Sequence, residues 1–288
     1  MVDLLTASVV VIAFIAMFIG SITDLKTREV PDWLNFSLIA TGLGLRAIFS
    51  VVQWDYTPFL NGLIGLGVFI AIGCLMFYTG QWGGGDSKLL MGLGALIGWD
   101  FTLDHFIINF VFALILVGAI YGIAWSIGLI ITHFKEFRAK VKIYLHDKKI
   151  FPFRVVSMAI AVLGIIAALI VKDIPTRLAI ISLVLLIYAS LYLYVFSKAI
   201  EDVCMIKTVP ISKVTEGDWI VGEVKHNNKV LASNKDLGIT WKQIGLIKKA
   251  HIKQITIKEG IPFVPSFLLA FLVALEYGNI LLHLASLI

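Results

Sequence analysis

One long uncharged stretch of the chain decides its fold class. Residues 105–132 read HFIINFVFALILVGAIYGIAWSIGLIIT, without a single Asp, Glu, Lys or Arg. A helix that crosses a bilayer needs about 20 apolar residues, so this run is long enough to span a membrane. The whole chain agrees, because 59% of its 288 residues are hydrophobic and only 15% are charged. Soluble domains average about 45–50% apolar and about 25% charged residues. The sequence therefore predicts a polytopic membrane protein.

Eight apolar runs predict an all-α membrane fold with about eight transmembrane helices. The first run, 4–23, has no basic n-region before it and no small-residue cleavage site after it, so we expect a retained helix. The fourth run, 87–99, is short, since 13 residues reach only about 20 Å in a helix. The other runs are 34–52, 58–79, 105–132, 155–171, 177–199 and 261–288.

Lys and Arg gather on one side of this eight-helix arrangement. Of the 24 basic residues, 21 lie in or directly beside the connections that follow the first, third, fifth and seventh helices. The opposite side carries Lys172 and Arg177 and the acidic Asp3, Asp55, Asp100 and Asp104. Because basic loops stay in the cytoplasm, we expect a plasma-membrane protein with both termini outside. These loops also account for the net charge of +5, so we expect no nucleic-acid partner.

Residues 200–260 have a different pattern. Segments 204–209, 218–224 and 251–258 alternate and are rich in β-branched residues, which predicts short strands. Glu216-Gly217 and Asn227-Asn228 predict turns, and Thr240-Trp-Lys-Gln243 has the spacing of a capping box that opens a short helix. The lysines of this segment form either a solvated basic face or a contact with anionic lipid.

The chain is therefore expected to have three parts. Residues 1–199 form a transmembrane core of seven helices, and 200–260 form a small α+β cytoplasmic module. Residues 261–288 form the last transmembrane helix, which completes the core. The sequence leaves the ligand of the module and the oligomeric state open, and a homo-oligomer is one of the alternatives.

Two aspartates at helix ends are the candidate catalytic residues. Asp24 ends the first helix, and Asp86 stands at the entrance of the fourth, so the topology places both at the cytoplasmic face. Ionisable groups at membrane depth are costly and are functional candidates. Two facing carboxylates share one proton, so one can activate water while the other donates to the carbonyl under attack. Taken singly, each motif is better explained without catalysis, with Asp24 and Asp32 as ordinary interfacial charges beside snorkelling Lys26 and Arg28.

The glycines before Asp86 have a backbone role. Gly83, Gly84 and Gly85 permit positive φ and let another chain approach closely. The turn could receive an extended peptide beside the aspartate, or it could be a flexible connection. Pro262 and Pro265 in turn open the last helix, as prolines often do, and they could leave carbonyls unpaired at the depth of the two aspartates.

Other hydrolytic chemistries lack their residues. The chain contains no His-Glu-x-x-His and no Gly-x-Ser-x-Gly, and its two cysteines, Cys74 and Cys204, have no partner nearby in sequence. Ser87 and Lys88 are adjacent and would not face each other on a helix. We expect neither a metal nor a cofactor. Arg46 is expected to snorkel or to pair with an acid, whereas the place of Glu276, in the bundle or near the outer interface, stays open.

Three motifs together resemble the type IV prepilin peptidase family, the membrane aspartyl proteases with a Gly-x-Gly-Asp signature. Its archaeal branch includes the preflagellin (prearchaellin) peptidases. The first motif is Asp24 with Arg28, Pro31 and Asp32 downstream. The second is Gly83, Gly85 and Asp86 with Lys88, and the third is Pro262-Phe263-Val264-Pro265. The resemblance touches the first hundred residues and the last thirty.

The resemblance implies an aspartic endopeptidase that removes short basic leader peptides from pilin-like or archaellin precursors at the cytoplasmic face. It implies that Asp24 and Asp86 are the catalytic pair. The residues that would support catalysis or position substrate are Gly83, Gly84, Gly85, Lys88, Arg28, Asp32, Pro262 and Pro265. The first cytoplasmic loop lacks the cysteines of the large bacterial members, so no methyltransferase activity is expected.

A proton-coupled transporter or channel is the alternative, because it could use the same membrane carboxylates. Transporters often carry paired broken helices in corresponding halves, and this sequence has no such duplication. Both key acids also lie at one face of the membrane rather than at its midplane. These two features favour the peptidase.

Overall fold

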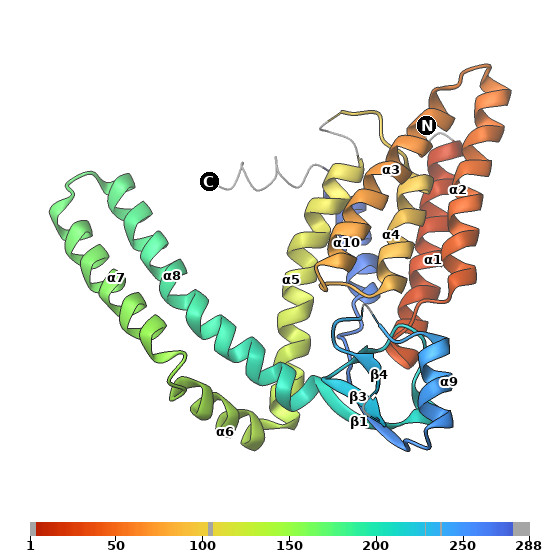
Figure 1. The fold of residues 1–288 in the computed structure, drawn as a ribbon. Helices are drawn as coiled ribbons and strands as arrows, with labels where there is room; N and C mark the ends of the chain where they lie inside the picture. The colour runs from red at the N-terminus through yellow and green to blue at the C-terminus, as the bar shows by residue number, and fades with distance from the viewer. Residues whose placement is uncertain (1–3, 103–105, 228, 237, 279–288) are drawn as a thin grey trace. The chain divides into compact units, whose positions relative to one another are not determined.

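The structure, a computed structural model, describes residues 4–102, 106–227, 229–236 and 238–278. It is mostly helical, which is consistent with a polytopic membrane protein, and it also has a small sheet region (Figure 1). Its α-helices are α1 (Leu4–Thr27), α2 (Asp32–Gln53), α3 (Thr57–Tyr78), α4 (Gly84–Ile97), α5 (Phe106–Thr132), α6 (Phe134–Leu145), α7 (Phe151–Ile170), α8 (Ile174–Ile200), α9 (Trp241–Lys249) and α10 (Val264–Tyr277).

Six of these helices are long and apolar enough to cross a membrane. They are α1, α2, α3, α5, α7 and α8, the last extended by a π-helical turn, Glu201–Met205. The eight predicted runs correspond to these six and to α4 and α10. The predicted positions His105 and 279–288 lie outside the described residues. With 14 described residues each, α4 and α10 are too short to meet the length of a span, so eight spans remain a prediction.

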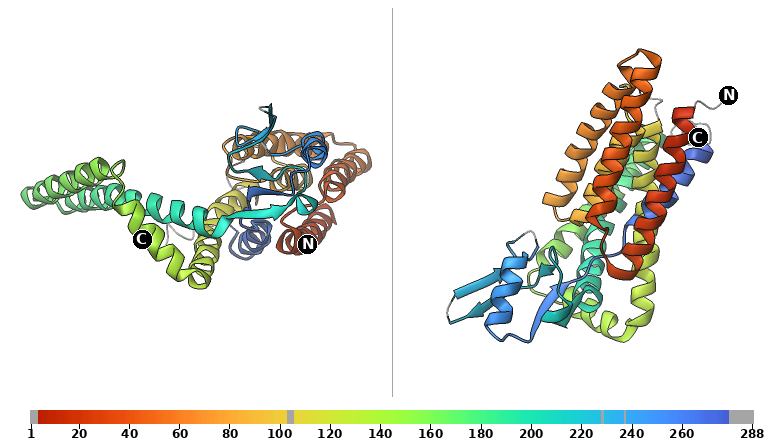
Figure 2. Two further views of the ribbon diagram at one scale, coloured as in Figure 1. Left: turned by 60° about the horizontal axis from the view of Figure 1, so that its bottom comes forward. Right: turned by 90° about the vertical axis from the view of Figure 1, so that its right-hand side faces the viewer.

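The chain divides into two compact units. The first unit contains residues 1–125, 210–255 and 259–288, and the second contains 126–209 and 256–258. In the first unit α4 packs between α2 and α3, while α10 runs beside α1 (Figure 2). The core of this bundle is apolar and includes Met17, Phe69, Phe110, Phe267 and Phe271, all fully buried.

Glycines let α4 approach its neighbours at backbone distance. A Cβ on Gly42 of α2 would lie 2.7 Å from the backbone nitrogen of Leu96, and a Cβ on Gly65 of α3 would overlap the carbonyl oxygen of Gly94. Small residues at such positions are typical of helix packing in membranes, where close backbone contact replaces the hydrophobic effect as the driving force. This packing fixes α4, the helix that carries Asp86.

Arg46 is buried inside this bundle and binds backbone carbonyls. Its Nε donates to the carbonyl of Leu96 at 3.0 Å, Nη1 donates to Pro58 at 3.1 Å, and Nη2 donates to Ile97. The prediction that Arg46 snorkels or pairs with an acid is therefore wrong. The last carbonyls of a helix have no intrahelical donors, and a cation there also complements the helix dipole.

Arg46→Lys is expected to lower the free energy of unfolding of the purified protein by about 3 kcal/mol. A lysine ammonium cannot reproduce the planar fork that reaches three carbonyls, and each hydrogen bond to a charged group contributes about 1.5–3 kcal/mol. Heat-induced unfolding in detergent measures the change. Arg138→Lys, at an exposed position of α6, is the control and should unfold like the wild type. Equal stability of Arg46→Lys and wild type would contradict this role.

The second unit is built on the α7–α8 hairpin, whose two helices run side by side (Figure 1). α6 precedes the hairpin, and its Phe137 stacks on Phe196 of α8 with ring centroids 5.8 Å apart. Tyr144 of α6 donates a hydrogen bond to Asp202. Burial, followed by the hydrogen bond to Asp202 and the charge of that carboxylate, raises the pKa of Tyr144 to about 12.

Five short strands form the sheet region. They are β1 (Ile206–Pro210), β2 (Trp219–Ile220), β3 (Glu223–His226), β4 (Lys229–Ser233) and β5 (Gln254–Lys258). One sheet has the order β1-β5-β2, and the other is the antiparallel hairpin β3-β4, which pairs Glu223 with Ser233 and His226 with Lys229.

The predicted elements of this region are largely present. The capping box at the start of α9 is confirmed, since Gln243 N–H donates to Thr240 Oγ1 at 3.3 Å and Thr240 N–H donates to Gln243 Oε1 at 2.8 Å. The predicted strand 218–224 is wrong in one respect, because Gly222 adopts φ +81 and separates β2 from β3. In the predicted Asn227-Asn228 turn, Asn227 adopts φ +48, and Asn228 lies outside the described residues. The division of the chain at 200 and 260 stays a prediction.

Candidate active site

Asp24 connects the first helix to the last. It lies in the final turn of α1 and is only 4% exposed. Its Oδ2 accepts a hydrogen bond at 2.9 Å from the backbone N–H of Val264, the first residue of α10. The first N–H groups of a helix have no intrahelical acceptor, and a carboxylate is favourable there because the helix N-terminus is the positive end of its dipole. Asp24 thus caps α10 across 240 positions of sequence.

The end of α1 is a left-handed turn. Arg28 adopts φ +61 and donates its backbone N–H to the Asp24 carbonyl at 2.9 Å. A left-handed residue after the last helical turn satisfies a carbonyl that would otherwise lack a donor. The turn also sends the chain toward α2 and brings Val30 against the glycine turn that precedes Asp86.

Asp86 is the third residue of α4 and is half-buried. Its Oδ2 accepts a hydrogen bond at 3.3 Å from the N–H of Gly83, which caps the helix. The negative charge of Asp24 acts on Asp86, so the two carboxyl groups lie within electrostatic range of each other although 62 positions separate them in sequence. The fold therefore brings the two predicted aspartates together.

Gly83, Gly84 and Gly85 act through close approach rather than through positive φ. None of the three adopts positive φ, and the nearby left-handed glycine is Gly80, with φ +70. A Cβ on Gly85 would lie 3.1 Å from the backbone nitrogen of Val30. Among the described residues, a Cβ on Gly83 would meet within 4 Å only the carboxylate of Asp86. Gly85 thus admits this protein's own chain, and Gly83 leaves space open beside Asp86.

Two predicted supporting residues form ion pairs. Lys88 Nζ lies 2.6 Å from Asp32 Oδ1, which joins the start of α4 to the start of α2. Arg28 Nε lies 3.7 Å from Glu259 Oε1, and its guanidinium lies over the ring of Trp125, 5.2 Å from the centroid. These pairs hold the segments around the two aspartates, and they also neutralise much of the Asp32 charge.

Pro262 and Pro265 shape the start of α10. Pro262 is buried, and Pro265 is the second residue of the helix, where its missing N–H costs no hydrogen bond. The expectation of unpaired carbonyls is wrong for Phe263, whose carbonyl accepts from the Ser266 N–H at 2.9 Å and from Ser266 Oγ at 2.6 Å. The group that reaches the aspartate is instead the Val264 N–H.

An aromatic cluster beside Asp24 was not predicted from the sequence. Phe263 lies at its centre, with ring centroids 5.8 Å from Trp82, 6.5 Å from Tyr121 and 5.9 Å from Phe267. Tyr121 in turn stacks on Trp125 at 5.9 Å. These side chains come from apolar runs of the sequence. Within such a run, the sequence does not distinguish an aromatic residue that faces lipid from one that faces a functional site.

Three buried polar atoms near the aspartates have no hydrogen-bond partner among the described residues. They are Arg28 Nη1, Asn35 Oδ1 and the Tyr121 hydroxyl. Asn35 is fully buried on α2, and its Nδ2 donates to the carbonyl of Gly85 at 3.5 Å. Glu276, whose place the sequence left open, is exposed on the last turn of α10.

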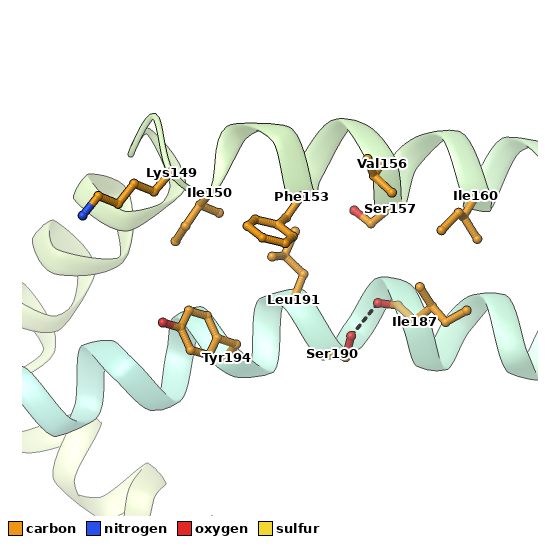
Figure 3. Close-up of a pocket in the computed structure, with 10 residues that line it drawn as sticks. All are labelled: Lys149, Ile150, Phe153, Val156, Ser157, Ile160, Ile187, Ser190, Leu191 and Tyr194. Carbon is orange, nitrogen blue, oxygen red and sulfur yellow. Dashed lines mark hydrogen bonds between the residues drawn. The ribbon is translucent and has the colours of Figure 1, made fainter.

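The second unit contains a cleft of about 520 Å³ between α7 and α8 (Figure 3). Phe153 and Leu191 point toward each other across it, and its lining contains none of the predicted site residues. Within the described ranges, no three His, Cys, Asp or Glu side chains lie close enough together to hold a metal ion.

Comparison with known proteins bears on the first part of the chain. Residues 11–123 match the type IV leader peptidase family. The preflagellin peptidase of Methanocaldococcus jannaschii is 39% identical over 87 residues, which are 30% of this chain and 37% of that protein. The preflagellin peptidase of Methanococcus voltae is 36% identical over 86 residues, 30% of this chain and 36% of that protein. Prepilin peptidase EppA of Methanothermobacter thermautotrophicus is 30% identical over 94 residues, 33% of this chain and 24% of that protein.

The aligned part of the chain spans little more than a third of the length of the two preflagellin peptidases. The family match contains both aspartates and the glycine turn, and it ends within α5, before α10. The resemblance to archaeal prepilin and preflagellin peptidases is therefore confirmed over residues 11–123, the part of this membrane protein that matches the type IV leader peptidase family.

Proposed function

We propose that the protein is an aspartic endopeptidase that removes short basic leader peptides from pilin-like or archaellin precursors. The observation that carries the proposal is the electrostatic proximity of Asp24 and Asp86 at two helix ends that lie far apart in sequence. The family match over residues 11–123 and the preflagellin peptidases among the relatives support the same activity.

In the proposed mechanism, Asp24 and Asp86 hold one water molecule between them and share one proton. Two close carboxyl groups in a poorly hydrated site do not ionise together, so the pair titrates as a unit. The ionised member takes a proton from the water, and the protonated member donates to the carbonyl oxygen under attack. The Val264 and Gly83 N–H groups orient the two carboxyl groups, and no covalent intermediate forms.

The scissile bond must reach the pair in extended form, because a helical peptide bond is hidden in the i→i−4 ladder. The open side of Gly83 is where we place the extended strand, next to Asp86. The apolar helix of the precursor then stays in the bilayer, and its leader stays in the cytoplasm. The proposal includes a topology with eight spans and both termini outside. In this topology residues 200–260 form a cytoplasmic module between the core and the last helix.

The purified protein in lipid nanodiscs, incubated with a precursor that has a basic leader and an apolar helix, tests the function. Mass spectrometry should detect one new N-terminus at the junction of leader and helix, with no methyl group added. The same preparation carrying Asp24→Asn is the control and should leave the precursor whole. An intact precursor after incubation with the folded wild type would refute the proposal.

Acidic side chains near the turn after α1 are suited to a basic leader. Glu29 is exposed, and Asp218 is half-buried close to Glu29 and Glu259. Burial is the main cause that raises the pKa of Asp218, and the negative charges of the two glutamates add to it. Asp32 is paired with Lys88, so we assign the attraction mainly to Glu29 and Asp218.

Replacing the leader's Lys and Arg by Glu is expected to lower kcat/KM several-fold at low salt and less at high salt. Each exposed pair contributes only about 0.2–1 kcal/mol, and salt screens it within about 10 Å at 0.1 M. Steady-state cleavage at two ionic strengths measures the effect. Glu29→Gln enzyme should discriminate less between the two leaders, whereas Glu276→Gln, at the far end of α10, should discriminate like the wild type. Equal rates for both leaders would show that recognition rests on the apolar helix or on the residue before the bond.

A further inference from the structure

The hydroxyl of Tyr121, on α5, lies near Asp24. Its ring packs on Phe263 and Trp125, and its hydroxyl oxygen is buried without a hydrogen-bond partner among the described residues. The charge of Asp24 acts on this hydroxyl, and so does the charge of Arg28. A buried hydroxyl that lacks a partner destabilises a protein, because it has lost its hydrogen bonds to water without replacing them. A ligand that brings an acceptor to this hydroxyl would remove that destabilisation.

The packing of the Tyr121 ring against Phe263 and Trp125 fixes the position of its hydroxyl. Gly118 lies one turn earlier on α5, and a Cβ there would come within 2.8 Å of the Phe263 ring. Gly118 thus admits Phe263 against α5, and Phe263 immediately precedes Val264, the donor to Asp24. The side chain that carries the unpaired hydroxyl and the backbone that orients Asp24 are therefore parts of one packed cluster.

A second unpaired donor lies in the same cluster. Arg28 Nη1 is buried without a partner in the described part of the chain, and its guanidinium lies over Trp125, the ring on which Tyr121 stacks. Two donors without acceptors match a ligand that brings oxygen atoms. An extended peptide brings a backbone carbonyl at each residue, and none of these is bonded within the peptide itself.

We propose that Tyr121 is a substrate-binding residue whose hydroxyl donates a hydrogen bond to a backbone carbonyl of the precursor, next to the aspartate pair. This inference rests on the proposed peptidase function. It deepens that function by naming a recognition group on α5. The contact is made in the bound precursor before and during the reaction, so it contributes to binding and leaves the chemical step largely unchanged.

Tyr121→Phe tests the proposal because it removes only the hydroxyl. We expect the dissociation constant of a fluorescent precursor for the inactive Asp86→Asn enzyme to rise about fivefold, the value of one net hydrogen bond. In the active enzyme KM should rise by a similar factor while kcat stays within about twofold, the pattern of lost uniform binding. Tyr78→Phe, at an exposed tyrosine of α3, is the matched control and should change neither constant.

The thermal midpoint without precursor separates this role from a structural one. Removing an unpaired buried hydroxyl should leave the midpoint of Tyr121→Phe unchanged or raise it. A lowered midpoint would show that the hydroxyl is bonded in the free protein and would overturn the proposal. Unchanged binding and KM in Tyr121→Phe, with Asp24→Asn inactive, would overturn the proposal and leave the peptidase function intact. A wild type that neither binds nor cleaves the precursor would overturn both.

Discussion

Asp24→Asn and Asp86→Asn are each expected to lower precursor cleavage by about 10² to 10⁴-fold, the usual contribution of a positioned acid or base. Asparagine has nearly the same shape as aspartate, and its Oδ1 can still accept the hydrogen bond from the Val264 or Gly83 N–H. It cannot exchange a proton with water. The variants should therefore lose the chemistry while keeping the fold, and kcat measured with purified protein gives the loss.

The control for both variants is Asp55→Asn, in the exposed connection between α2 and α3. Its Oδ1 accepts from the Thr57 N–H at 2.9 Å, a bond that asparagine can also accept. It should cleave and unfold like the wild type. If Asp24→Asn or Asp86→Asn lowers cleavage by less than about 10²-fold, that residue does not belong to the catalytic pair.

Gly65→Ala is expected to cause a large loss of stability in the bundle. The added Cβ would overlap the carbonyl oxygen of Gly94, a backbone atom that cannot rotate away. Overpacking a tight core costs about 1–3 kcal/mol even where side chains can adjust. Since α4 carries Asp86, its displacement should also lower cleavage. Heat-induced unfolding in detergent and the cleavage rate measure the two effects.

Gly67→Ala is the matched control on the same helix. No atom of the described residues lies within 4 Å of a Cβ built there, and alanine is the better helix former, so this variant should be as stable as the wild type or more stable. If Gly65→Ala and Gly67→Ala unfold at the same temperature, the close contact between α3 and α4 does not determine the stability of the bundle.

The helices could be predicted because their signal is local. Apolar runs bounded by charged residues give most helix ends within about four residues, a common error for sequence-based boundaries. The same local signal does not predict α6. Phe134–Leu145 carries four basic residues and one acidic residue, a composition typical of a charged loop. It is an amphipathic helix that buries only Phe137, so the length of its apolar face gives little signal.

The pairings within the site could not be predicted because they depend on distant partners. The sequence identifies Asp24 and Asp86 as chemically unusual, but no spacing rule connects Asp24 to the N–H of Val264. The partners of Arg46 could not be predicted either, because they are backbone carbonyls, which every residue has. For Tyr121, the missing signal is a hydroxyl without a partner, a property that exists only in three dimensions.

The hydrogen bond between Asp24 and Val264 also sets the time at which the site can be completed. Val264 follows Asp24 by 240 residues, so a ribosome that adds about 5–20 residues per second reaches it roughly 12–48 s later. Asp86 follows Asp24 by only 62 residues, so for most of that interval the nascent chain already contains both aspartates but lacks the donor that orients Asp24. A chain released before residue 264 therefore never acquires it. If the protein has the proposed function, only chains that extend past residue 264 therefore contain the complete site for cleaving precursors.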